Sequence, residues 1–321
     1  MSKTSLNGRA TGDANTREAR LRVAVAAAMP LSGLVVLFAF RDSWQPWQRL
    51  AGATLGMLCL IKAAVFFRES RTKFSAVGKW IFFTCWPGVD PSPFGLGCSR
   101  VRKDAGDGSQ TLADSATCSD SLKLMGRGAM VMLIGLAMVV AVAFGASRES
   151  DWIGWVGIAA LFVTLHLGFA NVLTGAVRLN GWPVRRLFEN PFQSRSLGDF
   201  WGRRWNLAFV EMDRMLFMRP LRRVLGARGA ILGVFVISGF LHEMAISYPV
   251  QAGWGGPMAY FVLQGVLVLF ESRYLKRWPV AALRVWAWFW IFAPLPLLFH
   301  APFRERLIVP LFRNLNHWIF P

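Results

Sequence analysis

Long apolar stretches separated by polar, arginine-rich segments dominate the pattern of this chain. Most of these stretches approach the roughly 20 residues that an α-helix needs to cross about 30 Å of hydrocarbon. The pattern predicts an all-α, polytopic transmembrane helical protein with about seven spans and additional interfacial helices around a buried cavity. The expected spans are Val23–Phe40, Leu50–Phe67, Ala129–Ala146, Trp152–Val177, Ala230–Pro249, Pro257–Phe270 and Val280–Phe299.

The polar segments between the spans predict the first element boundaries and the domain organisation. Residues 1–21 are polar and predict a disordered cytoplasmic tail, which leaves 22–321 as a single transmembrane domain. Residues 79–93 are apolar at first and then turn, so they predict an interfacial or re-entrant piece that is too short to span. Residues 94–122 are rich in Gly, Ser and Asp and predict a loop.

Composition supports a membrane protein and accounts for the charge. Apolar residues make up 54% of the chain, the mean hydropathy is +0.39, and 36 basic residues face 18 acidic ones. Eleven arginines lie in 178–228 and nine Lys or Arg in 68–127, whereas 41–49, 147–151 and 250–256 together hold three. This asymmetry follows the positive-inside rule and places the N-terminus and both long basic segments in the cytoplasm. No nucleic-acid motif is present, so nucleic acid is not an expected partner.

The segment after Pro191 predicts an amphipathic helix. Ser196 and Asp199 fit a capping pattern at a helix start. Beyond them, aromatic and apolar residues recur at helical spacing with charged residues between them, which gives a face for lipid or protein and a basic face for anions. The apolar positions are Phe200, Trp201, Trp205, Phe209 and Met212, and the charged ones are Arg203, Arg204, Asp213 and Arg214.

The strongest candidate for chemistry is the pair His242–Glu243, because ionisable groups at membrane depth are costly and usually functional. On a helix, Ser238 shares the face of His242, while Gly239 shares the face of Glu243 and permits a close helix approach. A zinc protease is excluded, since H-E-x-x-H needs a histidine where Ile246 stands. Four cysteines without C-x-x-C predict neither a disulfide framework nor a metal site. No P-loop or nucleophile elbow occurs.

The other candidate is Asn206, a neutral donor where the amphipathic helix runs into an apolar stretch. An amide at this position is suited to polarise a carbonyl delivered from the cytoplasmic side. By composition alone, the tryptophans of this segment also fit the role of interfacial anchors. Its arginines also fit the role of setting the orientation in the membrane. The remaining histidines are weaker candidates: His166 predicts a packing or hydrogen-bonding role, and His300 and His317 lie at an interface and near the end of the chain.

These residues together resemble a known family. The string S-x-S-L-x-D-F-W-G-R-R-W-N at 194–206, followed by S-G-x-x-H-E at 238–243, resembles the wax-synthase-like branch of the membrane-bound O-acyltransferases. Residues 86–91 also look like the P-G-x-D-P element of that family. The resemblance runs over about 86–271, and the chain is shorter than many members of the superfamily. It implies that 22–321 form one transmembrane acyltransferase domain.

The resemblance implies an acyl transfer from a thioester, usually acyl-CoA, to a hydroxyl within the bilayer, with no cofactor. The family's histidine falls on His242, the general base, and its asparagine on Asn206, which donates to the oxyanion. Basic residues at the cytoplasmic mouth, Arg203 and Arg204 first, are suited to the phosphates of CoA. Trp201, Trp205, Ser238 and Glu243 are expected to support substrate binding.

Two other functions stay open at the sequence level. A proton-coupled transporter or flippase would use His242 and Glu243 as its coupling pair, although no internal repeat is found. A membrane scaffold would have little reason to retain a buried ionisable pair. The expected partners are acyl-CoA, membrane lipids and a lipophilic alcohol, and that alcohol is open among long-chain alcohols, diacylglycerol, sterol-like alcohols and secondary-metabolite hydroxyls.

Overall fold

The computed structural model describes residues 39, 42–68, 76–94, 108–146 and 152–320, with the backbone alone for 108–117. These residues form helices and contain no strand. Five helices are long and apolar enough to cross a membrane, which confirms the predicted all-α, polytopic membrane fold. They are Pro46–Phe66, Cys118–Gly145, Trp152–Leu179, Leu207–Val250 and Val280–Leu298. The predicted tail 1–21 and the predicted span Val23–Phe40 lie outside the described residues.

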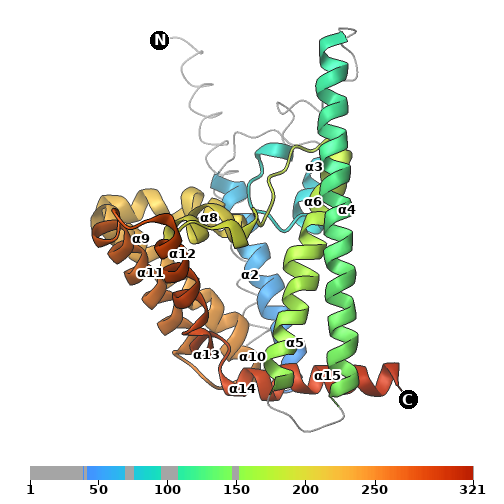
Figure 1. Cartoon of the computed structure of the whole chain (residues 1–321), viewed down its shortest axis with the longest axis vertical. Helices are drawn as coiled ribbons and strands as arrows, with labels where there is room; N and C mark the ends of the chain where they lie inside the picture. Colours follow the sequence, from blue (N-terminus) through green and yellow to red (C-terminus); the bar gives the residue numbers. More distant parts are fainter. Residues whose placement is uncertain (1–38, 40–41, 69–75, 95–107, 147–151, 321) are drawn as a thin grey trace, which may run out of the picture.

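Two groups of helices make up the molecule in Figure 1. In the first, the long helix α4 (Gly108–Gly145) stands beside one continuous helix. The two pack closely because Gly168 leaves its backbone bare; a Cβ there would lie 2.6 Å from the backbone of Met132. The continuous helix consists of α5 (Trp152–Phe162), the π-helical turn η3 (Val163–Phe169) and α6 (Ala170–Leu179).

In the second group, α9, α11 and α12 are inclined toward the first group, and α2 is seen between the two groups (Figure 1). Short helices and the helix α15 join the groups at the lower end of the view. The elements concerned are α2 (Pro46–Arg68), α9 (Met218–His242), η7 (Glu243–Ser247), α10 (Tyr248–Val250), α11 (Gly256–Tyr274), α12 (Val280–Phe292), α13 (Leu295–Leu298), α14 (Ala301–Phe303), η8 (Arg304–Ile308) and α15 (Val309–Ile319).

The helix α9 contains a fold-back that the hydropathy pattern did not predict. Gly226 has φ 69° and ψ −178°, a conformation open to glycine and costly for other residues. Leu221 consequently lies against Gly233, and a Cβ at Gly233 would be 3.0 Å from Leu221 Cδ1. Residues twelve apart in one straight helix would be about 18 Å apart. The Leu207–Val250 segment is therefore a helical hairpin in which only the part after Gly226 matches the predicted span.

The helix α11 packs antiparallel on the second arm of this hairpin. Gly239 lies against Met258, and Gly265 lies against Phe235, so small residues on each helix receive a large side chain from the other. This confirms the expected close approach at Gly239. At 19 residues, α11 contains the predicted span Pro257–Phe270 but is not among the five helices that meet the spanning criteria.

The short segment after α2 is built as expected, but the following loop is shorter than predicted. Helix α3 (Ala76–Trp80) and the π-helical turn η1 (Ile81–Cys85) form a short apolar helix that is too short to span, followed by the 3₁₀ turn η2 (Ser92–Phe94). Buried Lys62 of α2 donates to the carbonyl oxygens of Phe82 and Trp86 and holds this segment. The prediction of a loop over 94–122 is wrong from Gly108 onward, because α4 extends well beyond its apolar part.

The predicted single amphipathic helix after Ser196 is also wrong. Ser196 does cap a helix, since its Oγ accepts the N–H of Asp199 at 3.1 Å. The helix ends at Trp205, which is extended, and Asn206 adopts the left-handed conformation with φ 38° and ψ 64° before a new helix begins. The elements are η4 (Pro191–Gln193), α7 (Leu197–Asp199), η5 (Phe200–Arg204), α8 (Leu207–Met212) and η6 (Asp213–Phe217).

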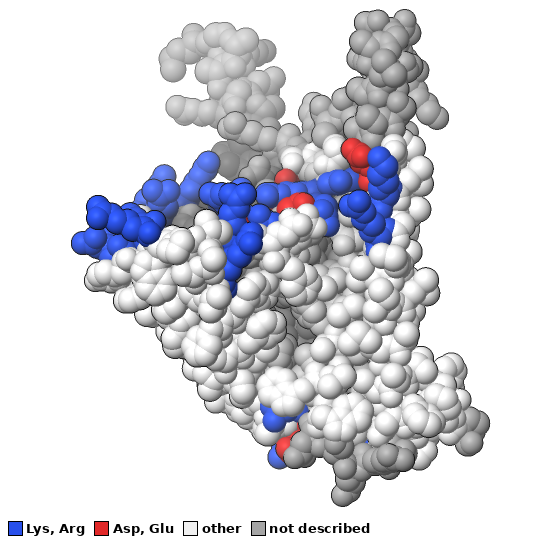
Figure 2. Space-filling view, viewed as in Figure 1, with Lys and Arg blue, Asp and Glu red and all other residues white. Residues whose placement is uncertain are grey.

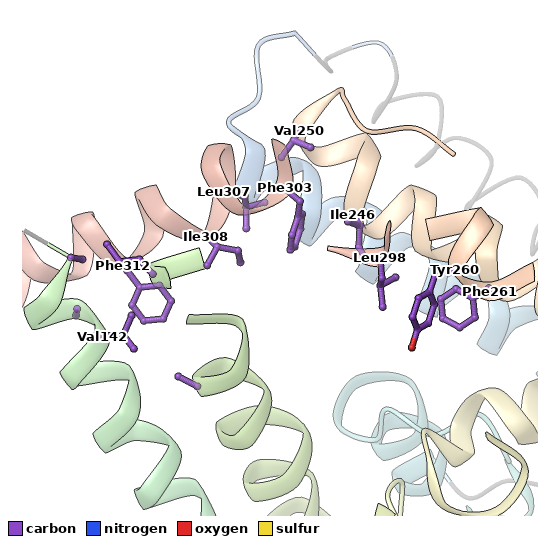
Figure 3. Packing of buried hydrophobic residues seen from close by; sticks show 14 residues of the cluster. Val142, Ile246, Val250, Tyr260, Phe261, Leu298, Phe303, Leu307, Ile308 and Phe312 are labelled. Carbon is purple, nitrogen blue, oxygen red and sulfur yellow. The ribbon is translucent and has the colours of Figure 1, made fainter. Parts of the chain in front are cut away.

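A buried apolar cluster ties the two groups of helices together at the lower end. Figure 3 shows its side chains, which come from α4 and α5, from η7 and α10, from α11 and from the C-terminal helices. Phe312 of α15 lies on one side of the cluster, and Tyr260 and Phe261 of α11 lie on the other (Figure 3). Because Phe261 also touches His242, the core fixes the position of the candidate base.

Lys and Arg gather at one end of the molecule in Figure 2, the end where α8 and the start of α9 lie. A wide belt of uncharged surface follows below them in this view. This distribution is typical of a membrane protein with one basic face.

Candidate active site

His242 is the last residue of α9 and lies directly before the π-helical turn η7. Its Nδ1 lies 2.7 Å from the carbonyl oxygen of Ser238. A carbonyl oxygen can only accept a hydrogen bond, so Nδ1 carries the proton and Nε2 keeps a lone pair. The ring centroids of Phe261 and Phe209 lie 4.1 Å and 5.8 Å from the centroid of the imidazole. The histidine is therefore held as the tautomer that can accept a proton at Nε2.

Asn206 occupies the break between η5 and α8. The backbone on both sides of it is bonded to the preceding loop: Leu207 N–H donates to Leu187 O at 2.8 Å, and Glu189 N–H donates to Arg204 O at 2.8 Å. Asparagine tolerates the left-handed conformation better than most residues, so Asn206 suits this break in the chain. Two backbone bonds thus fix the position of its side-chain amide.

A cavity of about 310 Å³ lies between these two residues. It brings together five of the eight residues that the sequence predicted for the site, namely His242, Asn206, Ser238, Trp201 and Trp205. Phe209, Val210, Val234, Phe235 and Phe261 make most of the remaining wall apolar. Asp213 and Arg214 also line it. Electrostatic interactions are stronger in such an apolar surrounding than in water.

Trp201 and Trp205 form part of the wall and are anchored from behind. Trp201 Nε1 donates to Gln264 Oε1 at 3.0 Å, and fully buried Gln264 donates in turn to Trp290 O at 2.6 Å. Trp205 stacks on Phe200 at 4.9 Å and on Phe162 at 5.0 Å. Hydrogen bonds and stacking therefore hold the indoles in place, which gives the cavity a rigid wall.

The two arginines predicted to bind phosphate have different surroundings, and neither lines the cavity. Arg203 is exposed. Arg204 Nε donates to Asp199 Oδ2 at 2.7 Å, and its Nη1 donates to the carbonyl oxygen of Asn190. Burial alone would raise the pKa of Asp199, but bonds from Arg195 N–H and Arg204 hold it below its usual range. Arg204 is thus committed to the loop that carries Asn206.

Glu243 points away from the cavity and caps a helix. Its Oε1 accepts the N–H groups of Gly255 at 2.8 Å and Met258 at 3.0 Å, at the N-terminus of α11. Glu271, near the other end of α11, caps α7 in the same way through Leu197 N–H and Gly198 N–H. A carboxylate at a helix N-terminus satisfies orphan N–H groups and favours the helix dipole. The two glutamates attach the walls of the cavity to each other.

His300, which the sequence reading placed at an interface without a role, is buried and fully bonded. Its Nδ1 accepts Phe303 N–H at 3.2 Å, and its Nε2 lies 3.2 Å from Ser247 Oγ. His166 packs between Phe162 and Phe188, as expected. The charged cavity residues that the sequence did not predict for the site are Asp213 and Arg214. Only the spacing of seven residues from Asn206 to Asp213, about two helical turns, could have indicated one of them.

Comparison with known sequences addresses the same part of the chain. Residues 182–263 match the sequence profile of the membrane bound O-acyl transferase family. This segment, about a quarter of the chain, contains Asn206, His242 and most of the cavity wall. The predicted family resemblance is confirmed.

Curated relatives place the resemblance in the wax-synthase-like branch of the membrane bound O-acyl transferases. A probable long-chain-alcohol O-fatty-acyltransferase 7 of Arabidopsis thaliana is 35% identical over 31% of this chain and 33% of its own length. The long-chain-alcohol O-fatty-acyltransferase of Simmondsia chinensis is 37% identical over 26% of each. An acyl-CoA–sterol O-acyltransferase 1 of Arabidopsis thaliana is 29% identical over 37% and 38%. The alignments with these relatives span about a quarter to two fifths of their own length.

Proposed function

We propose that this protein is a membrane-embedded O-acyltransferase that moves a fatty acyl group from acyl-CoA to the hydroxyl of a lipophilic alcohol. The observation that carries the proposal is the bond between His242 Nδ1 and Ser238 O at 2.7 Å, which leaves Nε2 as a proton acceptor at a cavity that Asn206 also lines. The named relatives are acyltransferases for long-chain alcohols and sterols, which supports the reaction class.

In the proposed reaction, His242 Nε2 takes the proton of the acceptor hydroxyl as the hydroxyl oxygen attacks the thioester carbon. The thioester oxygen becomes an oxyanion, and the side-chain N–H of Asn206 donates a hydrogen bond to it. The C–S bond then breaks, the thiolate of CoA takes the proton from His242 Nε2, and the ester is released. The proton of the acceptor hydroxyl thus ends on the thiol of CoA, and His242 is again neutral.

The basic end of the molecule is the proposed cytoplasmic side, where acyl-CoA arrives (Figure 2). On this assignment the N-terminus and both long basic segments are cytoplasmic. Exposed Arg203 is the better candidate for a CoA phosphate, because Arg204 would have to give up its bond to Asp199. Arg203→Ala should raise the apparent KM for acyl-CoA, whereas Arg204→Ala should act mainly by loosening the Asn206 loop.

The test is acyl transfer in isolated membranes that contain the protein. Labelled acyl-CoA is offered with a panel of acceptors: a long-chain alcohol, a sterol and a diacylglycerol. Ester should form with at least one acceptor and be lost in His242→Ala. Exposed His317 of α15 provides the matched control, and His317→Ala should retain the activity. Normal transfer by His242→Ala would contradict the proposal.

Consumption of the thioester distinguishes the acyltransferase from the transporter alternative. A proton-coupled transporter would move its substrate without consuming thioester. The surroundings of Glu243 weigh against its use as a coupling group, because its Oε1 is bonded to two backbone N–H groups of α11. Substrate uptake into sealed vesicles with no release of CoA would favour the transporter.

A further inference from the structure

One polar group of the cavity has no partner and no part in the proposed reaction. Asp213 opens the π-helical turn η6 and lines the cavity, and its Oδ1 is enclosed with no hydrogen bond from any described residue. Asp199 differs, because Arg204 and Arg195 N–H bond to it. Glu271 also differs, because it accepts two backbone N–H groups. Glu243 accepts two at Oε1, and its Oε2 is likewise enclosed without a partner among the described residues, but Glu243 does not line the cavity.

The surroundings of Asp213 in the cavity are mostly apolar. Val210, Val234 and Phe235 line the same space. Arg214 lines it as well, but the described residues show no ion pair between Arg214 and Asp213. A carboxyl group left unsatisfied in an apolar enclosure destabilises a fold. Such a group is explained when a ligand supplies the missing donor.

The position of Asp213 indicates which part of a ligand it meets. Asp213 follows Asn206 by seven residues, which places it about two helical turns, or roughly 10 Å, from the proposed oxyanion site. The next residue, Arg214, also lines a second cavity of about 550 Å³ together with Arg185 and Glu211. Asp213 therefore lies between the reacting groups and the arginine-bearing wall.

We infer that Asp213 is a specificity-determining residue whose carboxyl accepts a hydrogen bond from an N–H or O–H group of a bound substrate, about two helical turns from the reacting carbonyl. The inference rests on the proposed function. Two substrates can supply such a donor: an amide N–H in the arm of the thioester, or a second hydroxyl on the acceptor. The place of Asp213 beside the arginine-bearing wall favours the amide of the thioester arm.

The experiment compares Asp213→Leu and Asp213→Asn with the wild type in membranes. Each protein receives acyl-CoA or an acyl ethanethiol ester, which has no amide, and a long-chain 1-alcohol or the matching 1,2-diol. In Asp213→Leu, kcat/KM for acyl-CoA should fall by about tenfold relative to that for the amide-free ester, as expected for one lost hydrogen bond. Asp213→Asn should lose less, because its amide oxygen still accepts.

The outcomes separate the two sources and the two proposals. The alternative result is a tenfold loss with the 1,2-diol relative to the 1-alcohol, with no difference between the two thioesters. In that case the donor is the second hydroxyl of the acceptor, and the inference stands. If all substrate ratios equal those of the wild type, the inference is overturned while the acyltransferase proposal survives. A wild type that forms no ester with any pair overturns both.

A stability measurement excludes a merely structural role. Removal of an unpartnered carboxyl should raise the thermal unfolding midpoint of Asp213→Leu in detergent, while its substrate ratio falls. A structural carboxyl would lower that midpoint, and a lower midpoint together with unchanged ratios contradicts the inference. Asp120→Leu is the control, since Asp120 is exposed and pairs only loosely with Lys123 at 3.8 Å.

Discussion

Two histidines with serine neighbours differ in which ring nitrogen carries the proton. His242 lines a cavity and donates from Nδ1 to the carbonyl oxygen of Ser238, which leaves the lone pair on Nε2. His300 accepts Phe303 N–H at Nδ1, so its Nε2 carries the proton and donates to Ser247 Oγ. The two rings are opposite tautomers. One keeps a lone pair on Nε2 beside the cavity residues, unbonded by any described residue, and the other uses both nitrogens to hold the fold.

Substitution of the two histidines should give the largest difference. His242→Gln should lower the rate of acyl transfer by about 10²–10⁴-fold, the usual contribution of a general base. His300→Gln should change kcat by only a few-fold and lower the thermal unfolding midpoint instead. Initial rates and melting curves of the two variants check this contrast, which disappears if both lose activity equally.

Asn206 can be separated from its backbone role by glycine, which also adopts the left-handed conformation. Asn206→Gly should keep the fold and reduce kcat by about 10²–10³-fold through loss of the oxyanion donor. Asn190→Gly is the matched control, because Asn190 has φ 45° and does not line the cavity. Equal activities of the two variants would show that Asn206 serves only the chain path.

Glu243 follows His242 in the chain, yet its charge acts on His300. Glu243→Ala should destabilise the protein by about 2–3 kcal/mol, since two N–H groups at the start of α11 lose their acceptor. Glu243→Gln keeps the accepting oxygen and should retain both stability and transfer activity. Chemical denaturation in detergent measures the difference in stability. A Glu243→Gln variant that is stable but inactive would instead favour a role of the charge in the reaction.

The smallest expected effect is a pH dependence that belongs to His300. Its burial, together with the charge of Arg304, lowers its pKa below the ordinary 6.5, although Glu243 opposes this. The unfolded chain then binds the proton more readily than the folded one. Stability from this group is complete above about pH 6.5 and is lost as the pH falls, by at most about 1.4 kcal/mol per unit. Melting curves between pH 8 and pH 5 should be flatter for His300→Gln, and parallel curves would contradict the assignment.

The sequence by itself determined the membrane fold and the family resemblance, and it predicted His242 and Asn206 as candidate site residues. Apolar length and charge asymmetry act locally along the chain, so the spans at α2, α4, α5–α6 and α12 could be read directly. The close helix contact at Gly239 was readable for the same reason, since small residues mark helix interfaces in membranes.

Tertiary structure alone decided the rest, because these features depend on partners far apart in the chain. The fold-back at Gly226 sets Leu221 against Gly233, and hydropathy cannot register a turn between two helical arms. The tautomer of each histidine depends on which group meets Nδ1. In the sequence, Glu243 and Glu271 cannot be told apart from catalytic carboxylates. Only the contacts of Glu243 with α11 and of Glu271 with α7 show that they cap helices. Asp213 lines the cavity because α8 and η6 run along it. A helical pattern in the sequence does not show which neighbouring elements the helix will meet.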